Sequence, residues 1–206
     1  MYFDIAICII TYNRGKRALE NVENILKNIK KNFCVLVLNN GSNLGGEEYK
    51  RIEDLSKENS QLFYKRHVTN TQFYGNFRSC FDFNNSKYIM ILSDEDFVNI
   101  DGLDDILNDL KNYNNVAACR TSIEPHKDLI TPGNSYIYPN EYFMAGVSAL
   151  NGFSFFGNYV SGIIYNLELI KKTDLLNILD KNITLHKAYP HMYFDLLVAS
   201  LFDIIL

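Results

Sequence analysis

YIMILSDEDF, residues Tyr88–Phe97, joins a short apolar run to three consecutive acids. An apolar run of this length between polar residues predicts a strand buried in a sheet. The carboxylates of Asp94, Glu95 and Asp96 follow at the end of that strand, where they repel one another unless a cation lies nearby. A divalent metal with hard oxygen ligands is the simplest such cation, and it in turn binds phosphate groups. The stretch therefore predicts a nucleotide diphosphate site.

Residues 1–120 alternate between strand-like and helix-like segments. Continuous apolar runs predict strands, and apolar residues that recur every three or four positions predict helices. This alternation is typical of an α/β, Rossmann-like fold, a mainly parallel sheet with helices on both faces. Strands are expected at 3–10, 33–38, 62–66, 88–92 and 116–119, with helices between them, the last of which is expected to be capped by Asp101.

Three polar clusters follow strands of this expected sheet. They are Thr11–Arg14 after the first strand, Asn39–Ser42 after the second and Ser93–Asp96 after the fourth. The carboxyl ends of parallel strands share one edge of a sheet, so the three clusters are expected to meet there. Each cluster alone has an ordinary interpretation as a turn, but the three together favour a ligand site.

The second half of the chain, residues 121–206, is less regular. A loop at 128–139 is long enough to be a functional lid over the sheet edge. The pair Ser161-Gly162 interrupts an expected strand, where small residues let a substrate approach the backbone. Helices are expected at 140–150, 167–179 and 189–206, and a strand at 158–165.

The boundary near residue 120 suggests two parts of one domain. Residues 1–120 are expected to bind the nucleotide, and residues 121–206 to form an acceptor side. The chain stops at the apolar sequence FDIIL, residues 202–206. This suggests a truncated chain, or an end that packs on a partner subunit or rests on a membrane, although residues 192–206 lack the Lys- and Arg-rich face of an interfacial helix.

Composition limits the partners and the compartment. The 206 residues carry a net charge of −4, which gives no electrostatic reason to expect nucleic acid. The four cysteines are widely spaced and most lie in apolar runs, so they are typical of buried thiols in a reducing compartment and not of a zinc site. The chain begins without a signal-like segment and has no run as long as a membrane span, so a cytoplasmic location is expected.

In this order, the clusters resemble the nucleotide-sugar-binding domain of the inverting, family 2-like glycosyltransferases with the A-type (GT-A) fold. Members begin with a strand that runs into a Thr-Tyr-Asn-Arg-like turn, here Ile10–Arg14. Their Asp-Xaa-Asp element is matched by Asp94–Asp96, and the segment before the fourth strand by Asn70 with Gly75–Phe77. The resemblance covers about residues 1–120.

The second cluster departs from the family pattern. The family has Asp, then Asp or Asn, then Gly-Ser, whereas this chain has Asn39, Asn40, Gly41 and Ser42. A charged contact to the base or ribose is thereby replaced by a neutral one, which leaves the identity of the base open.

The resemblance implies roles for several residues. Asp96 ligates Mn²⁺ or Mg²⁺ with Asp94 as its neighbour, and the activity is inverting transfer of a sugar from a nucleotide-diphosphate sugar to an acceptor hydroxyl. The acceptor is a glycan or a lipid-linked glycan, and the setting is bacterial surface glycan synthesis. The residues expected to bind the nucleotide are Thr11, Tyr12, Asn13, Asn40, Asn76 and Asp94.

The proton acceptor is expected in the C-terminal half, near the start of a helix. Pro190 suits a first helical turn, and His191 and Asp195 are four residues apart on one face. Either side chain is a candidate catalytic base. The alternative interpretation is an ordinary solvent-exposed helix face.

Two other functions are considered. A sugar nucleotidyltransferase is disfavoured, because the first loop contains only Gly15 and Lys16 of the glycine- and cation-rich sequence that binds a triphosphate. A nucleotide-sugar-binding pseudoenzyme or incomplete subunit remains open, since donor binding by itself does not require transfer.

Overall fold

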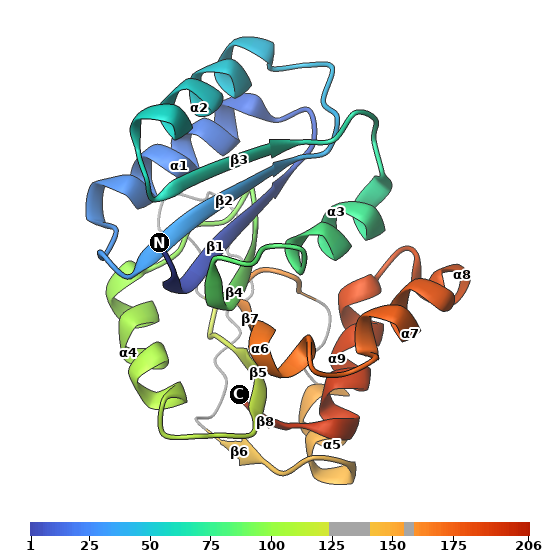
Figure 1. Cartoon of the computed structure of the whole chain (residues 1–206). Helices are drawn as coiled ribbons and strands as arrows, with labels where there is room; N and C mark the ends of the chain where they lie inside the picture. Colours follow the sequence, from blue (N-terminus) through green and yellow to red (C-terminus); the bar gives the residue numbers. More distant parts are fainter. Residues whose placement is uncertain (124–140, 155–158) are drawn as a thin grey trace, which may run out of the picture.

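The computed structural model describes residues 1–123, 141–154 and 159–206 (Figure 1). The described strands form one eight-stranded sheet in the order β3-β2-β1-β4-β7-β5-β8-β6. The bounds are β1 Phe3–Thr11, β2 Phe33–Asn39, β3 Leu62–Arg66, β4 Ser86–Ser93, β5 Val116–Arg120, β6 Tyr142–Phe143, β7 Ile163–Asn166 and β8 Asp203–Ile205. The helices are α1 Gly15–Asn28, α2 Gly46–Glu58, α3 Gln72–Cys80, α4 Ile100–Leu110, α5 Val147–Ser154, α6 Leu167–Ile170, α7 Leu175–Lys181, α8 Ile183–His186 and α9 Pro190–Leu201.

The first half has the parallel arrangement that the sequence predicts. β1 pairs in parallel with both β2 and β4, and β2 pairs in parallel with β3. Antiparallel pairing begins at β7, which inserts between β4 and β5. The prediction of an α/β fold with a mainly parallel sheet is therefore confirmed.

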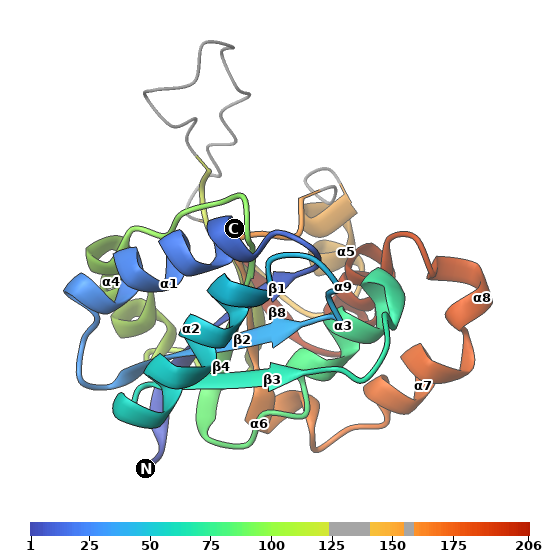
Figure 2. The same cartoon turned by 90° about the horizontal axis from the view of Figure 1, so that it is seen from above.

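Helices cover both faces of the sheet (Figure 2), and a cluster of buried apolar side chains lies on each face. Successive side chains of a strand point to opposite faces. Ile5, Ile7 and Ile9 of β1 accordingly pack with α1, α2 and α4, whereas Cys8 and Ile10 pack with α3, α5, α6, α7 and α9. With both faces buried, β1 needs the continuous apolar sequence that identified it.

The C-terminal end is a strand, and not the helix expected to reach residue 206. α9 ends at Leu201, and β8 pairs in parallel with β5 and antiparallel with β6. Phe202 to Leu206 are therefore buried against other elements of the same chain.

Three other elements differ from expectation. The segment 140–150 contains the short strand β6 before α5, because Tyr142 and Phe143 pair with β8. The segment 167–179 divides into α6 and α7, and β7 begins only at Ile163, after Gly162 adopts a φ of 81°. The expected lid at 128–139 lies outside the described residues.

The cap of α4 also differs from the expected one. The side chain of Asn99 accepts a hydrogen bond from the backbone N–H of Gly102 at 3.2 Å, so Asn99 is the N-cap. Asp101 lies one residue inside the helix and pairs with Lys30 at 2.8 Å. In the part of the chain that the structure describes, no helix is both long and apolar enough to cross a membrane.

Candidate nucleotide site

A pocket of about 420 Å³ lies at the carboxyl ends of β1, β2 and β4. Residues from all three polar clusters line it, as the parallel topology predicts. The three clusters therefore lie at the edge of the sheet that the sequence predicts, and residues of each line one pocket. The lining residues are Ile10, Thr11, Tyr12, Arg14, Asn40, Asn70, Gln72, Phe73, Asn76, Ser93, Asp94 and Val160.

Asn13 connects the first two clusters. Its φ of 57° is left-handed, a conformation that asparagine tolerates better than most residues. The Asn13 side-chain oxygen accepts the backbone N–H groups of Asn43 and Leu44 at 2.9 and 3.1 Å, and its own N–H donates to Ser42 Oγ at 2.8 Å. Asn13 thus fixes the shape of the rim, and it does not line the pocket.

Asn40 connects the second cluster to α3. Its Oδ1 accepts hydrogen bonds from the backbone N–H and the hydroxyl of Thr71 at 2.9 and 2.7 Å. Its Nδ2 donates to Asn70 Oδ1 and to the carbonyl of Gln72, both at 3.0 Å. These bonds hold Gln72 at a φ of 61°, which is unusual for a residue with a long side chain. The start of α3 is therefore fixed against the pocket.

The contacts of Asn39 give a physical reason for an asparagine at the position where the family pattern has an aspartate. The Asn39 amide donates to Tyr64 Oη at 2.8 Å, and its oxygen accepts the backbone N–H of Ser42 at 2.9 Å. The residue is only 1% exposed, so a neutral amide that both donates and accepts suits this place better than a buried carboxylate.

Asp94 contacts Arg14 inside the pocket. Asp94 is 5% exposed, and its Oδ1 lies 3.2 Å from the Arg14 guanidinium. Burial raises the pKa of Asp94, while a hydrogen bond from Thr11 and the charge of Arg14 act against that rise. Arg14 also pairs with Glu95, and Arg17 lies 3.7 Å from the same carboxylate. The repulsion that the sequence predicts is therefore compensated by arginine at Asp94 and Glu95.

Asp96 faces a different set of partners. Its two carboxylate oxygens accept hydrogen bonds from Tyr159 Oη at 2.7 Å and Ser161 Oγ at 2.6 Å. The Asp96 carbonyl accepts the Asn21 amide at 2.6 Å. Ser161 Oγ also accepts the backbone N–H of Ser93 at 2.9 Å, which ties the segment before β7 to the end of β4.

The donor chemistry of these acids fits a divalent cation. Asp94 and Asp96 supply hard oxygen atoms, and Mg²⁺ is usually bound by one or two carboxylates together with substrate phosphates. Among the described residues, no group of three or more His, Cys, Asp and Glu side chains is arranged to bind a metal. A cation here would therefore depend on the nucleotide for the rest of its ligands.

Asp195 lies in a buried ion pair and not on an exposed helix face. It is 2% exposed, its Oδ2 pairs with Arg120, and its Oδ1 accepts the Tyr165 hydroxyl at 2.5 Å. Burial raises the pKa of Asp195, and the Arg120 charge acts against that rise. Burial also raises the pKa of Tyr165 well above its usual value, which keeps the phenol a hydrogen-bond donor. This position argues against Asp195 as the catalytic base.

His191, one turn before Asp195 on α9, packs against the wall of the pocket. It is 3% exposed, and its ring centroid is 5.8 Å from that of Phe73, which lines the pocket. Phe77 and Tyr189 also pack against the imidazole. The two candidate bases therefore share a helix but have different surroundings.

Several contacts of the site were missed in the sequence. Arg14 lies within the first cluster, but nothing local showed that its side chain pairs with acids 80 and 81 positions away. For the contacts of Asp96, the available signal was the pair Ser161-Gly162, which interrupts an expected strand, and Tyr159 lies two residues before that pair. Arg120 carried no local signal at all.

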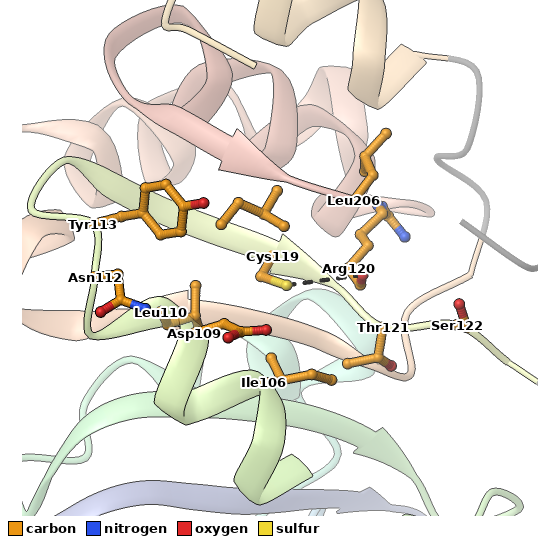
Figure 3. Close-up of a pocket in the computed structure, with 11 residues that line it drawn as sticks. Ile106, Asp109, Leu110, Asn112, Tyr113, Cys119, Arg120, Thr121, Ser122 and Leu206 are labelled. Carbon is orange, nitrogen blue, oxygen red and sulfur yellow. Dashed lines mark hydrogen bonds between the residues drawn. The ribbon is translucent and has the colours of Figure 1, made fainter. Parts of the chain in front are cut away.

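A second pocket, of about 280 Å³, lies between α4, β5 and β8 (Figure 3). Its described lining residues include Asp109, Cys119 and Leu206, and they belong to none of the three polar clusters. Burial raises the pKa of the Cys119 thiol to about 12, so the thiol is protonated and unreactive at neutral pH.

Comparisons with solved structures agree with the fold. Staphylococcus aureus TarS 1–349 in complex with UDP superposes with a TM-score of 0.70 at 16% identity, over 98% of this chain and 57% of that chain. The same protein in complex with UDP-GlcNAc gives a TM-score of 0.66 at 17% identity, over 98% and 55%. This chain thus spans little more than half the length of that protein, and at such identity the likeness shows the fold alone.

Comparison by sequence identifies the family. A search of curated proteins found no significant match. The family model for glycosyl transferase family 2 matches residues 6–173, which include the three polar clusters, β4, β7 and all but the first three residues of β1. The chain therefore belongs to glycosyl transferase family 2.

Proposed function

We propose that this chain transfers a sugar from a nucleotide-diphosphate sugar to an acceptor hydroxyl, with inversion at the anomeric carbon. The observation that carries the proposal is the pocket at the ends of β1, β2 and β4, where amides, hydroxyls, one arginine and one aspartate converge. Asp94 is the only carboxylate among the described residues that line it. A pocket with both a cationic and an anionic group suits a diphosphate better than a neutral ligand.

The nucleoside is proposed to lie against the amide-lined side of the pocket. Tyr12 is 40% exposed there and offers a ring for stacking, while Asn40 and Asn76 are nearly buried and define the wall. Thr11 Oγ1 lies 2.7 Å from Tyr49 Oη, which fixes the start of the turn. Asn13 contributes by shaping the rim.

The diphosphate is proposed to lie beside Asp94 and Arg14. Asp96 and Asp94 would hold Mn²⁺ or Mg²⁺, and the bound cation would stabilise the charge that develops on the departing nucleoside diphosphate. The hydrogen bonds from Tyr159 and Ser161 orient the Asp96 carboxylate before any ligand arrives. This pre-organisation lowers the cost of ordering the site when the donor binds.

The acceptor hydroxyl must lose a proton as it attacks. Of the two candidates, we assign this role to His191, because the oxygens of Asp195 are already held by Arg120 and Tyr165. His191 packs against Phe73 at the pocket wall, so a small displacement of that ring would open the imidazole to the acceptor. Asp195 is then a positioning residue within residues 121–206, the proposed acceptor side.

The biological setting follows from the same proposal. A glycan or a lipid-linked glycan is the proposed acceptor, in the synthesis of a bacterial surface glycan at the cytoplasmic side of the membrane. Residues 1–120 would bind the donor.

Calorimetry against a panel of nucleoside diphosphates, with Mn²⁺ and then with EDTA, tests the proposal. UDP is the first nucleotide to test, because TarS was solved with UDP and UDP-GlcNAc. We expect one nucleotide to bind well with Mn²⁺ and at least tenfold more weakly with EDTA. Failure of every nucleotide to bind in both conditions would contradict the proposal.

One observation favours a second candidate, a nucleotide-sugar-binding subunit without transfer activity. The buried ion pair and the Tyr165 hydroxyl occupy both oxygens of Asp195, one of the two candidate bases, so on this proposal the proton transfer depends on His191. Donor turnover by the wild type and by His191→Gln separates the two functions. Turnover that falls in the variant while UDP affinity is retained supports the enzyme, and binding without any turnover supports the subunit.

A further inference from the structure

Arg14 occupies the place beside the acids where a cation is needed. Its guanidinium contacts Asp94 Oδ1 at 3.2 Å and also pairs with the Glu95 carboxylate. The same side chain lines the pocket and is 49% exposed, so it has room to move. The backbone around it is fixed separately, because the Arg14 N–H donates to Tyr49 Oη at 3.1 Å.

A guanidinium and a divalent cation cannot both neutralise Asp94 at close range without repelling each other. In the free chain the charge of Asp94 is already balanced by Arg14, which weakens any cation bound by the acids alone. A diphosphate changes this balance, because its oxygens accept bidentate hydrogen bonds from an arginine. Arg14 then gains a new anionic partner, and Asp94 becomes available.

We propose that Arg14 is an internal competitor of the divalent cation and that it exchanges Asp94 for the donor diphosphate when the donor binds. This inference rests on the proposed function and adds a regulation of the same site. The cation and the nucleotide should therefore bind cooperatively, each raising the affinity of the other by the same factor. The exchange therefore favours binding of the cation to Asp94 only when a donor is present.

Arg14→Gln tests the exchange, and Arg17→Gln is the matched control. Arg17 is 59% exposed and lies 3.7 Å from Glu95, but it does not contact Asp94 or line the pocket. The measurements are calorimetric titrations of Mn²⁺ alone, UDP alone and UDP with Mn²⁺ into each protein, with circular dichroism to verify folding. Both arginine side chains reach solvent, at 49% and 59% exposure, and both are replaced by a polar residue, so both variants should fold.

We expect Arg14→Gln to bind Mn²⁺ alone about tenfold more tightly than the wild type, because one positive charge has left a half-exposed site. It should bind UDP alone about tenfold more weakly, since a charged hydrogen-bond partner is lost. The coupling between Mn²⁺ and UDP should shrink accordingly, while Arg17→Gln should resemble the wild type.

Unchanged or weaker Mn²⁺ binding by Arg14→Gln would overturn the inference, as would equal effects of the two substitutions. The proposed function fails separately, because its failure shows in the wild type, either as no binding of any nucleotide or as donor binding without turnover. If the wild type binds UDP with Mn²⁺ and Arg14→Gln has the same affinities for Mn²⁺ and UDP as the wild type, the proposed function stands and the competition by Arg14 is excluded.

Discussion

Replacement of Asp195 by alanine should destabilise the fold much more than it affects the chemistry. The substitution leaves Arg120 buried, 3% exposed, without its carboxylate partner, and it removes the acceptor of the Tyr165 hydroxyl. Breaking a buried ion pair in this way costs about 3–5 kcal/mol, because the remaining charge stays desolvated. A chain of this size loses roughly 2–4 °C of melting temperature per kcal/mol, so the expected decrease in Tm is about 6–20 °C.

Thermal unfolding followed by circular dichroism measures this decrease. The matched control is the double variant Arg120→Met with Asp195→Leu, which removes both charges and fills the space with apolar atoms. Its Tm should recover most of the loss, since replacing a whole buried pair is often neutral. A single variant that melts within about 2 °C of the wild type would refute the structural role and return Asp195 to the list of candidate bases.

The effect should also reach the site through the backbone. Arg120 donates to the Tyr159 carbonyl at 2.9 Å, and the Tyr159 hydroxyl donates to Asp96 at 2.7 Å. Loss of the ion pair therefore loosens the segment that orients Asp96. Below its Tm, Asp195→Ala should show weaker Mn²⁺-dependent donor binding and not a selective loss of turnover.

Three further predictions follow from other parts of the structure. Asp96→Ala should reduce the UDP affinity measured with Mn²⁺ to its value in EDTA, because a hard oxygen ligand of the metal is lost. If calorimetry still shows a UDP affinity that depends on Mn²⁺, Asp96 is excluded as a metal ligand. Burial acts to raise the pKa of Asp203, but hydrogen bonds from Tyr142, the Ala145 N–H and Asn115 outweigh burial, so the pKa is lowered in the folded state. The ionised Asp203 therefore stabilises the fold above about pH 4, and this stability is lost as the pH falls through the lowered pKa. Urea unfolding between pH 2.5 and about 6 should therefore show a smaller acid loss in Asp203→Asn than in the wild type, and equal slopes would contradict the assignment. Phe194→Ala should cost about 3–5 kcal/mol, because the ring is fully buried against Phe77, Phe81 and Tyr165; a loss below about 1 kcal/mol in urea unfolding would show that the core refills the cavity.

The local sequence was enough to identify most of the first half. A strand buried on both faces needs a continuous apolar run, and β1, β2 and β4 have one. Parallel pairing then places the polar residues that follow these strands at one edge. The position of the pocket therefore followed from residues that are neighbours along the chain.

The second half shows where local patterns stop being informative. Ile204 and Ile205 have the same apolar character in a helix and in a strand, and only the open edge of β5 makes them β8. Likewise, Tyr142 and Phe143 become β6 because β8 lies beside them. A short segment takes its secondary structure from the hydrogen-bond partners that the rest of the fold provides.

The sequence by itself determined the α/β class, the edge of the sheet that carries the pocket and the acids at that edge. Only the tertiary structure decided what each charge does. Arg120 and Asp195 are 75 positions apart, and Arg14 and Asp94 are 80 apart. Periodicity reports which residues are buried, but the pairing of two buried or half-buried charges depends on which strands and helices lie side by side. For that reason the carboxyl group of Asp195, for which the sequence pattern left an exposed helix face as an alternative, lies in a buried ion pair with Arg120 in the fold.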